Sequence, residues 1–398
     1  MKDILFITHF TQVPGEHGNG RFHYIADQVG RFGHKVEVIT SSFSHQKKQQ
    51  RIEGQVKLKN SSYKLTMVHE IGYKKNVSFS RFYSHYVMGL NLKKYLLGRE
   101  KPDVIYCSVP TLDVAKIAAE YAKKNEIKFI IDIQDLWPEA FKMLFNTPII
   151  SNILFYPMQR CADYIYRAAD EIIAVSNTYL DRALQVNKKC KNGKSIYLGT
   201  ELELFDRLSH GRVNKLKGEI WLAYIGTLGH SYEIELVIDS LSMLSEKGIK
   251  NIKFIIMGDG PLKQRFEDYA KEQNTWVEFM GRLQYEKMVG ILASCDIAIN
   301  PIKAGSAGSI INKVGDYAAA GVPVLNTQEC EEYRNLIEEY EAGFNCINGN
   351  AIDVANKLMI LVNDQKRREE MGRNNRRMAE DKFDRKKTYQ DILKLFEI

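Results

Sequence analysis

Residues 304–326 read AGSAGSIINKVGDYAAAGVPVLN, and this stretch holds a loop, a helix, a turn and a strand in succession. Small residues from Ala304 to Ser309 precede a helical pattern that begins near Asn312. Gly321 and Pro323 separate that helix from Val324–Asn326, whose apolar residues predict a short buried strand. A helix that returns directly to a strand is typical of parallel α/β folds.

The same alternation extends outward in both directions and predicts α/β structure throughout. Two series of parallel strands are expected, at Ile4–Thr8, Val36–Thr40, Val104–Ser108, Phe129–Asp132 and Glu171–Val175, and then at Trp221–Ile225, Lys253–Met257, Val277–Met280, Ile297–Asn300 and Val324–Asn326. The predicted fold class is two Rossmann-like, doubly wound parallel-sheet domains. The carboxyl ends of both sheets are expected to face a central cleft.

Length and composition agree with two globular domains. The chain has 398 residues, 44% of them hydrophobic, which excludes disordered and fibrous proteins. The polar and basic stretch 188–218 suits a linker. We therefore expect an N-terminal acceptor-binding domain at residues 1–190 and a C-terminal nucleotide-sugar-binding domain at 191–375. A charged helix at 376–398 is expected to pack its apolar stripe back on the N-terminal domain.

Charge and cysteine usage indicate the compartment. The formal net charge of +7 is too small for a nucleic-acid-binding protein, and no aromatic platform motif accompanies it. Six scattered cysteines without metal-ligand spacing indicate a reducing compartment, with neither a disulfide framework nor a zinc site. Because no signal peptide and no run of eighteen apolar residues is found, we expect a cytoplasmic protein.

Glycine marks several predicted strand ends. The loop from Gly15 to Gly20, which includes Gly18, follows the first strand and opens a helix, where an anion can be bound. In the C-terminal half, Gly226, Gly258 and Gly281 each follow a strand. Glycine admits a close approach because it has no Cβ. Each loop alone is most often a plain turn, but three consecutive strand ends favour a ligand site.

The helix that opens at Asn312 carries the most specific chemistry. Bare backbone amides at its start, with one ammonium from Lys313, can neutralise a diphosphate. Asp316, three residues later on the same helix face, can accept two ribose hydroxyls. The pattern suits a nucleotide-diphosphate sugar, whereas a plain Lys–Asp surface pair would be favoured if the segment stood alone.

Several motifs together resemble retaining glycosyltransferase family 4, which has the GT-B fold, and within it the branch that builds bacterial capsule and O-antigen polysaccharides. The motifs are G-x-L-G at Gly226–Gly229, G-D-G-P-L at Gly258–Leu262, V-x-F-x-G-R-L at Val277–Leu283, D-I-A-I-N-P at Asp296–Pro301, N-K-x-x-D-Y-x-A-A-G-V-P-V at Asn312–Val324, and G-H-x-V-x-V-I-T at Gly33–Thr40, P-D-V-I at Pro102–Ile105, D-L-W-P-E at Asp135–Glu139 and A-A-D-E-I-I-A-V-S at Ala168–Ser176. The resemblance covers nearly the whole chain and does not identify the sugar.

The resemblance implies a donor site in the C-terminal domain. The base is expected near Gly258 and the Arg282–Leu283 backbone, and the ribose on Asp316. The diphosphate is expected on Lys313 and on the amides around Gly226, Thr227 and Ser309, Ile310 and Ile311, with Gly18 and Gly20 contributing from the first loop. The sequence departs from the family in three places, because Gly308 replaces the first acid of a pair, Thr227 replaces an arginine, and residues 106–110 lack a histidine.

The resemblance also implies retaining, metal-independent transfer without a cofactor, in which the leaving diphosphate takes the acceptor proton. The candidate catalytic residues are Lys313, Asp135, Glu139 and His17. Asp135 and Glu139 could hold an acceptor hydroxyl, or could serve only as acids at a helix start. His9 and His17 lie beside the first loop and are weaker candidates.

A basic, aromatic segment at residues 73–101 and the apolar segment Phe145–Met158 suit a face that lies on anionic lipid. Lysines on such helices can equally serve only to solvate them. We expect the partners to be a UDP-sugar, a lipid-diphosphate-linked saccharide and the inner leaflet of the plasma membrane. Two alternatives stay open, namely a non-catalytic GT-B subunit that binds a nucleotide sugar and a nicotinamide oxidoreductase.

Overall fold

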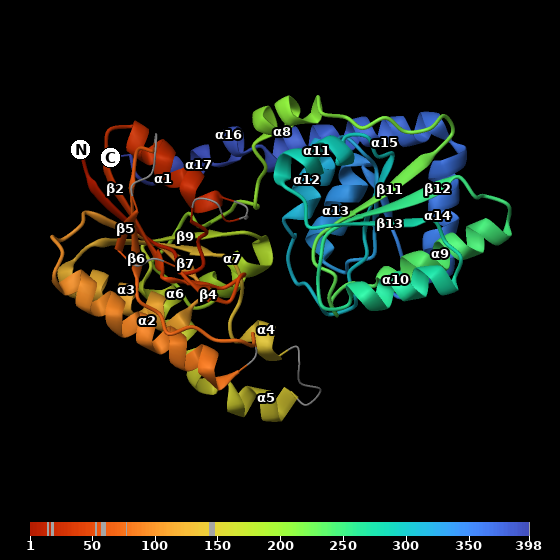
Figure 1. The fold of residues 1–398 in the computed structure, drawn as a ribbon. Helices are drawn as coiled ribbons and strands as arrows, with labels where there is room; N and C mark the ends of the chain where they lie inside the picture. The colour runs from red at the N-terminus through yellow and green to blue at the C-terminus, as the bar shows by residue number, and fades with distance from the viewer. Residues whose placement is uncertain are drawn as a thin grey trace. The chain divides into compact units, whose positions relative to one another are not determined.

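Figure 1 shows a chain divided into two α/β units, each built on its own sheet. The computed structural model describes residues 1–13, 16, 20–51, 54–56, 61–76, 78–142 and 148–397. Unit 1 comprises Met1–Ile196 and Tyr389–Ile398, and unit 2 comprises Tyr197–Thr388. Unit 1 is therefore discontinuous in sequence.

Within its described residues, unit 1 contains an eight-stranded sheet in the order β10-β9-β8-β7-β1-β2-β6-β5, with only the β5–β6 pair antiparallel. The strands are β1 (Asp3–Ile7), β2 (Lys35–Ser41), β5 (Gly54–Val56), β6 (Lys64–Val68), β7 (Val104–Val109), β8 (Lys128–Ile133), β9 (Glu171–Ala174) and β10 (Lys194–Ser195), with β3 (Phe43–Ser44) and β4 (Gln49–Gln50) forming a separate ribbon. The helices are α1 (Arg21–Arg31), α2 (Phe79–Leu97), α3 (Leu112–Asn125), α4 (Glu139–Lys142), α5 (Pro148–Leu154), α6 (Tyr156–Ala168), α7 (Asn177–Leu184) and α17 (Gln390–Leu393).

The described part of unit 2 contains a six-stranded, all-parallel sheet in the order β13-β12-β11-β14-β15-β16. Its strands are β11 (Ile220–Ile225), β12 (Ile252–Met257), β13 (Val277–Gly281), β14 (Ile297–Asn300), β15 (Val324–Asn326) and β16 (Gly343–Asn345). Its helices are α8 (Leu202–Ser209), α9 (Ile234–Glu246), α10 (Lys263–Glu272), α11 (Tyr285–Leu292), α12 (Lys313–Ala319), α13 (Glu331–Tyr340), α14 (Ala351–Asn363), α15 (Gln365–Met378) and α16 (Arg385–Thr388), with a π-helix at Ala379–Phe383.

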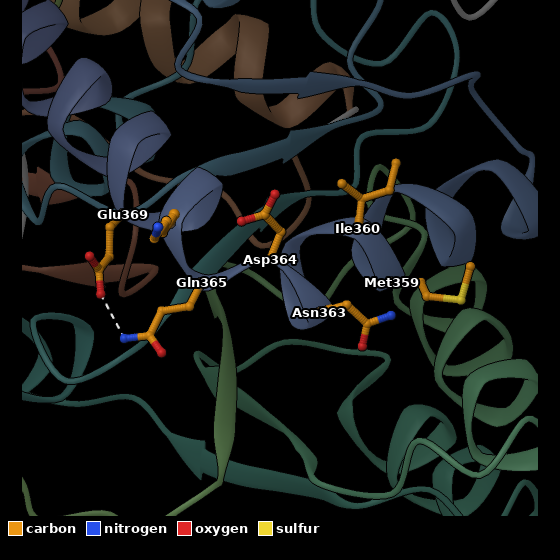
Figure 2. A pocket seen from close by; sticks show the side chains of 7 residues that line it. Met359, Ile360, Asn363, Asp364, Gln365 and Glu369 are labelled. Carbon is orange, nitrogen blue, oxygen red and sulfur yellow. Dashed lines mark hydrogen bonds between the residues drawn. The ribbon is translucent and has the colours of Figure 1, made fainter.

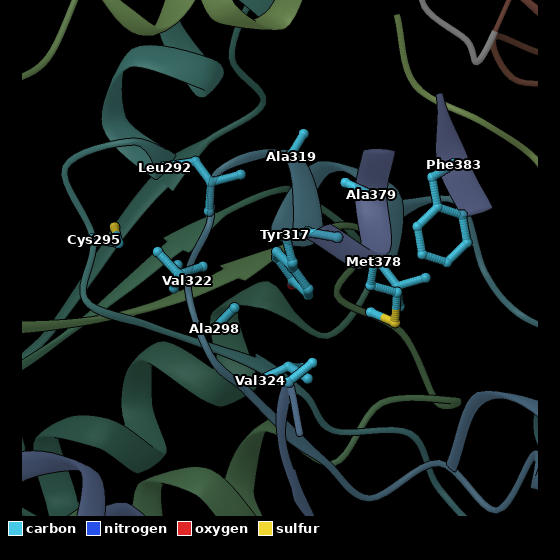
Figure 3. Close-up of a cluster of buried hydrophobic side chains, with 14 of the residues drawn as sticks. Leu292, Cys295, Ala298, Tyr317, Ala319, Val322, Val324, Met378, Ala379 and Phe383 are labelled. Atoms are coloured by element: carbon cyan, nitrogen blue, oxygen red, sulfur yellow. The ribbon is translucent and has the colours of Figure 1, made fainter. Parts of the chain in front are cut away.

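The sheet of unit 2 buries both faces, which is why its strands are almost continuously apolar. Along β11, Trp221 and Ala223 join the cluster on one face and Leu222 and Tyr224 join the cluster on the other. Figure 3 shows the first cluster, in which Tyr317 lies among the side chains of helices and strands. This packing fixes α12 against the sheet.

All ten predicted strands are confirmed to within a residue or two at their ends, and so are the two doubly wound parallel sheets. The prediction missed β6 and β16, whose sequences mix polar residues or glycine with apolar ones. It also missed that the stretch 188–218 holds β10 and α8. No helix in the described ranges is long and apolar enough to cross a bilayer.

The C-terminal segment is shared between the two units. Met378, Ala379 and Phe383 pack in the core of unit 2, although residues 376–398 were expected as one helix on the N-terminal domain. The π-helix is followed by Asp384, whose backbone is extended, and the chain then supplies Tyr389, Ile392, Leu393 and Phe396 to the core of unit 1. The apolar stripe predicted from the sequence therefore includes the residues that complete that core.

The docking of this last segment makes a prediction about stability. Phe396 is 1% exposed, and its ring centroid lies 5.7 Å from those of Phe6 and Tyr106. Phe396→Ala should lower the free energy of unfolding of unit 1 by about 3–5 kcal/mol through the cavity it leaves. Lys394→Ala, at an exposed side chain of the same segment, is the control. Equal denaturant midpoints for the two variants would contradict this packing.

Candidate functional site

The strand order of unit 2 reverses between β11 and β14, and ligands bind at the carboxyl ends of strands at such a point. Tyr317 of α12 joins the two strands there. Its hydroxyl accepts a hydrogen bond from the Ile225 amide at 3.0 Å and donates one to the Ile299 carbonyl at 3.1 Å. The first turn of α12 is thereby held at the switch point.

Lys313, the first residue of α12, is buried at this switch point with 8% of its surface exposed. Its Nζ lies 4.0 Å from the ring centroid of Tyr224 and 4.1 Å from that of Tyr232. A Cβ on Gly226 would lie only 2.8 Å from the same nitrogen. Within the described part of the chain, Nζ has no hydrogen-bond partner.

Burial lowers the pKa of Lys313 well below its usual range, because the ammonium loses its hydration. Cation–π contacts with the two tyrosine rings offset part of this loss of hydration, since a desolvated cation–π contact contributes about 2 kcal/mol. An uncompensated buried charge is strongly destabilising, so this arrangement is suited to an anion that a ligand brings.

The loop before α12 adds backbone donors to this cation. The amides of Ser309, Ile310 and Ile311 donate no hydrogen bond within the described ranges. Ile310 is buried in the core and Ile311 is packed against it, so side-chain packing fixes this backbone. The structure thus brings Gly226, Lys313 and the helix α12 together as the sequence predicted, while their role in binding remains a prediction.

Asp316, unlike Lys313, has hydrogen-bond partners among the described residues. Its carboxylate accepts hydrogen bonds from the Tyr285 hydroxyl at 3.0 Å and the Thr200 hydroxyl at 3.3 Å. Burial raises the pKa of Asp316 to about 6, although these two hydrogen bonds and the charge of Arg385 act in the opposite direction. The carboxyl group therefore titrates close to neutral pH.

The structure explains why glycine is required at two of the strand ends, which the sequence alone did not show. A Cβ on Gly258 would lie 1.7 Å from the carbonyl oxygen of Gly226, and one on Gly260 would lie 2.3 Å from that of Leu228. The loops after β11 and β12 therefore pack backbone against backbone, and glycine is required for this loop–loop contact.

Thr227, Arg282 and Leu283 occupy the rim of the same strand ends. Thr227 is exposed, and its carbonyl accepts a hydrogen bond from the Tyr224 hydroxyl at 2.7 Å. Arg282 is exposed after β13, whereas Leu283 is partly buried against the core. Through this hydrogen bond, Thr227 is linked to Tyr224, whose ring contacts the Lys313 ammonium.

In unit 1, Asp135 lies just beyond β8 and is half-buried. Its carboxylate accepts hydrogen bonds from the Leu136 amide at 2.9 Å, the Trp137 indole at 3.2 Å and the Tyr179 hydroxyl at 3.4 Å. Burial raises its pKa, and the three donors oppose that shift. Asp135 is therefore a rigidly held carboxyl group.

Glu139 opens α4 and is engaged in an ion pair with Arg182, whose Nε lies 2.6 Å from its Oε1. Gly20 precedes α1 with a φ of 72°, a conformation that favours glycine. His17 and Gly18 lie outside the described residues. The structure does not place the four residues proposed for catalysis in one unit, since Lys313 belongs to unit 2.

One buried group in unit 1 has the composition of a metal site, because His9, Glu70 and His85 place ligand atoms within 4.8 Å of one another. Both ring nitrogens of His9 are engaged, at 2.6 Å from Thr111 Oγ1 and 2.7 Å from Glu70 Oε2. Burial, His9 and the Arg81 guanidinium lower the pKa of His85 to about 2. His9 and Glu70 are already paired, whereas neither ring nitrogen of His85 has a hydrogen-bond partner among the described residues. Because the Arg81 guanidinium disfavours a second cation beside them, we interpret His9 and Glu70 as a hydrogen-bonded pair and assign no metal to this group.

Figure 2 shows a surface hollow where α14 gives way to α15. Gln365 Nε2 donates a hydrogen bond to Glu369 at 2.8 Å on its wall. Its lining, which is Met359, Ile360, Asn363, Asp364, Gln365, Lys366 and Glu369, includes none of the predicted site residues. The hollow is not part of the candidate site.

The sequence interpretation missed the side chains that surround the two key residues, namely Tyr224, Tyr232, Tyr285 and Thr200. Tyr224 was read only as part of a strand. The hydroxyl at the end of an otherwise apolar strand, two residues before Gly226, is a signal that could have found it. The other three come from loops or from a helix start, and no local spacing relates them to α12.

Two family models match the chain. Residues 21–203 match the model described as Glycosyltransferase Family 4, and residues 206–378 match the one described as Glycosyl transferases group 1. The two matches follow one another along the sequence and meet near the division between the units.

Among curated relatives, an uncharacterized glycosyltransferase of Methanocaldococcus jannaschii is 23% identical over 58% of this chain and 59% of its own length. The chain thus spans about three fifths of that relative. The capsular polysaccharide biosynthesis glycosyltransferase CapM of Staphylococcus aureus is 22% identical over 76% of this chain and 78% of its own length.

A solved structure with a similar fold is that of HepE from Anabaena in complex with UDP. It has a TM-score of 0.71 and 16% identity, and 99% of each chain is covered. The fold of two parallel-sheet units is therefore that of GT-B glycosyltransferases. With one glycosyltransferase model matching each half, the chain belongs to the GT-B glycosyltransferases and is of the family 4-like kind.

Proposed function

We propose that the protein is a retaining glycosyltransferase that transfers a sugar from a UDP-sugar to a lipid-linked saccharide in cell-surface polysaccharide biosynthesis. The observation that carries this proposal is the buried Lys313 ammonium, which has no partner among the described residues. A nucleotide-sugar diphosphate supplies the missing negative charge.

The donor is proposed to extend across the strand ends of unit 2. Its diphosphate contacts Lys313 and the amides of residues 309–311, and its ribose hydroxyls donate to Asp316. Its base lies near Gly258 and the Arg282–Leu283 backbone. The relation to HepE, which was solved with UDP, supports the choice of nucleotide.

The proposed mechanism depends on charge that develops on the leaving diphosphate. As the glycosidic bond breaks, a cation and oriented amides in contact with the phosphates stabilise the transition state more than the ground state. In a front-face reaction the leaving phosphate accepts the proton of the acceptor hydroxyl, so no protein nucleophile is needed. We propose that this chemistry uses no metal ion, since the ammonium and the amides supply the positive charge.

The acceptor is proposed to bind to unit 1, where Asp135 is held by three donors and can receive a hydrogen bond from an acceptor hydroxyl. The ion pair with Arg182 uses Oε1 of Glu139, and its buried Oε2 has no partner among the described residues. Glu139 is therefore proposed as a second carboxylate that can receive an acceptor hydroxyl. The relation to CapM supports a role in polysaccharide synthesis.

Unit 1 also carries an exposed apolar stripe along α2. Phe79, Tyr83, Tyr86, Leu90 and Leu97 are 92%, 61%, 52%, 47% and 69% exposed, and their spacing keeps them on one helix face. Lys93 and Lys94 are exposed on either side of this face. Ile150, Ile153 and Leu154 of α5 are exposed as well. We propose that the protein is cytoplasmic and that these side chains hold it at the anionic inner leaflet, where a lipid-diphosphate acceptor is presented.

The first test concerns Lys313. Wild-type protein with a UDP-sugar panel and a synthetic lipid-diphosphate saccharide should give a glycosylated lipid in mass spectra, and Lys313→Met should lower that rate by about 100-fold or more. Because the substitution removes a buried amino group that has no hydrogen-bond partner among the described residues, the unliganded variant should melt a few degrees higher than wild type.

Lys303→Met, at an exposed lysine of the same loop, is the control and should leave both quantities unchanged. Transfer by Lys313→Met at the wild-type rate would exclude the proposed role of the ammonium. UDP-sugar binding without any transfer would instead support the non-catalytic subunit.

A second prediction follows from the pKa of Asp316, which is about 6. Only the ionised carboxyl group can accept both ribose hydroxyls. As the pH falls below about 6, UDP affinity measured by calorimetry should therefore fall by about tenfold per unit. Asp316→Asn should bind more weakly at neutral pH and retain only the titration of UDP itself. Identical pH profiles for the two proteins would refute the ribose contact.

A third prediction concerns α2. Wild-type protein should float with vesicles that contain phosphatidylglycerol, and the double variant Phe79→Ser, Tyr86→Ser should lose most of that binding. The matched control replaces two exposed apolar residues of unit 2, Val213→Ser with Leu216→Ser. Binding should weaken with salt, since Lys93 and Lys94 each contribute about 1 kcal/mol. Equal flotation of both double variants would count against this face.

A further inference from the structure

Three neighbouring strands of unit 2 end on asparagine, and the three asparagines are in register. Asn300 of β14 pairs with Asn326 of β15, which pairs with Asn345 of β16. Nδ2 of Asn300 donates to Oδ1 of Asn326 at 2.9 Å, and Nδ2 of Asn326 donates to Oδ1 of Asn345 at 3.0 Å. We call these three side chains the asparagine ladder.

The asparagine ladder continues into Gln328, which lies just beyond β15. The same Nδ2 of Asn300 donates to Oε1 of Gln328 at 3.1 Å. Because this carbonyl oxygen is taken, the amide nitrogen of Gln328 must point the other way. Asn300, Asn326 and Gln328 are all fully buried, so water cannot replace these contacts.

The amide nitrogen of Gln328 holds the loop that precedes α12. Nε2 of Gln328 donates to the Ser309 carbonyl at 2.7 Å and lies 3.3 Å from the Ala307 carbonyl. In a planar trans peptide the N–H of the next residue is antiparallel to the carbonyl. The N–H of Ile310 is therefore directed away from Gln328, and it is one of the amides that donate no hydrogen bond within the described ranges.

Burying a row of amides at the carboxyl ends of strands is costly, and Oδ1 of Asn300 has no hydrogen-bond partner among the described residues. Apolar side chains could fill the same space without that cost. What the amides add is a defined orientation. The polarity of the asparagine ladder fixes Gln328, Gln328 fixes two loop carbonyls, and these carbonyls fix the loop N–H groups in the opposite direction.

We propose that Gln328 is a positioning residue for the diphosphate of the nucleotide sugar, and that the asparagine ladder sets its orientation. This inference rests on the proposed function, because it assigns the amides of residues 309–311 to the phosphates. It predicts that Gln328 affects the phosphates of the donor and leaves recognition of the nucleoside unchanged.

Gln328→Met keeps the length of the side chain but cannot donate. Calorimetry should show UDP binding weakened by about tenfold relative to wild type. Ligand-observed NMR titration should show uridine binding unchanged. Gln328→Asn, which keeps an amide but is one methylene shorter, should show the same selective loss and serves if the methionine variant folds poorly.

The matched control is Asn375→Leu, which removes another fully buried amide of unit 2, one that donates to the Val322 carbonyl at 2.6 Å. It should lower the melting temperature and leave the affinity for UDP as it is. If the Gln328 variants lose UDP and uridine equally, or lose neither, the inference is wrong while the proposed function stands. If the wild-type protein binds no UDP, the proposed function fails first.

Discussion

A cation that is buried without a counter-charge is the constraint on which the rest of this site depends. Lys313 lies at the switch point of unit 2 between two tyrosine rings, with its ammonium nitrogen unpaired among the described residues. Such a group lowers the stability of the folded chain unless a ligand brings a negative charge to it. Tyr317 fixes its helix to two strands, the loop before it offers free amides, and Gly226 leaves room beside the nitrogen. All of these features would help to bind a diphosphate beside the ammonium.

In unit 2, one group supplies charge and other groups supply orientation. Lys313 supplies a charge that acts over several ångströms and tolerates small displacements, whereas backbone amides act only when they point at their acceptor. The asparagine ladder and Gln328 hold the amide-bearing loop from behind, through side chains that are themselves fully buried. Asp316 is similarly held by Tyr285 and Thr200. The site is thus supported by polar contacts of α12 and of the loop before it, as well as by the packing of α12.

Much of the fold was predictable because buried parallel strands are nearly continuous apolar runs, as in β11 and β14. The strand β16, with the sequence GFN, lacks such a run and was missed. Within the candidate site, the spacing of Lys313 predicted a cation at a helix start, and the structure has one there. Sequence spacing could not show that the loops of Gly226 and Gly258 touch each other, or that tyrosines from three elements surround α12, because these contacts are long-range. Thr227 and Gly308 stand where the family pattern has an arginine and an acid, and neither residue indicates which side chain takes over that role.

The discontinuity of unit 1 has a consequence for how the chain is made. Tyr389, Ile392, Leu393 and Phe396 fill the space beside Phe6 and Tyr106, and they are joined to the chain only after all of unit 2. During synthesis, unit 1 therefore keeps an open apolar surface until all of unit 2 has been made. A released copy that lacks residues 389–398 would carry a complete unit 2 beside a unit 1 with an exposed apolar surface, which gives chaperones and proteases a physical feature by which to recognise it.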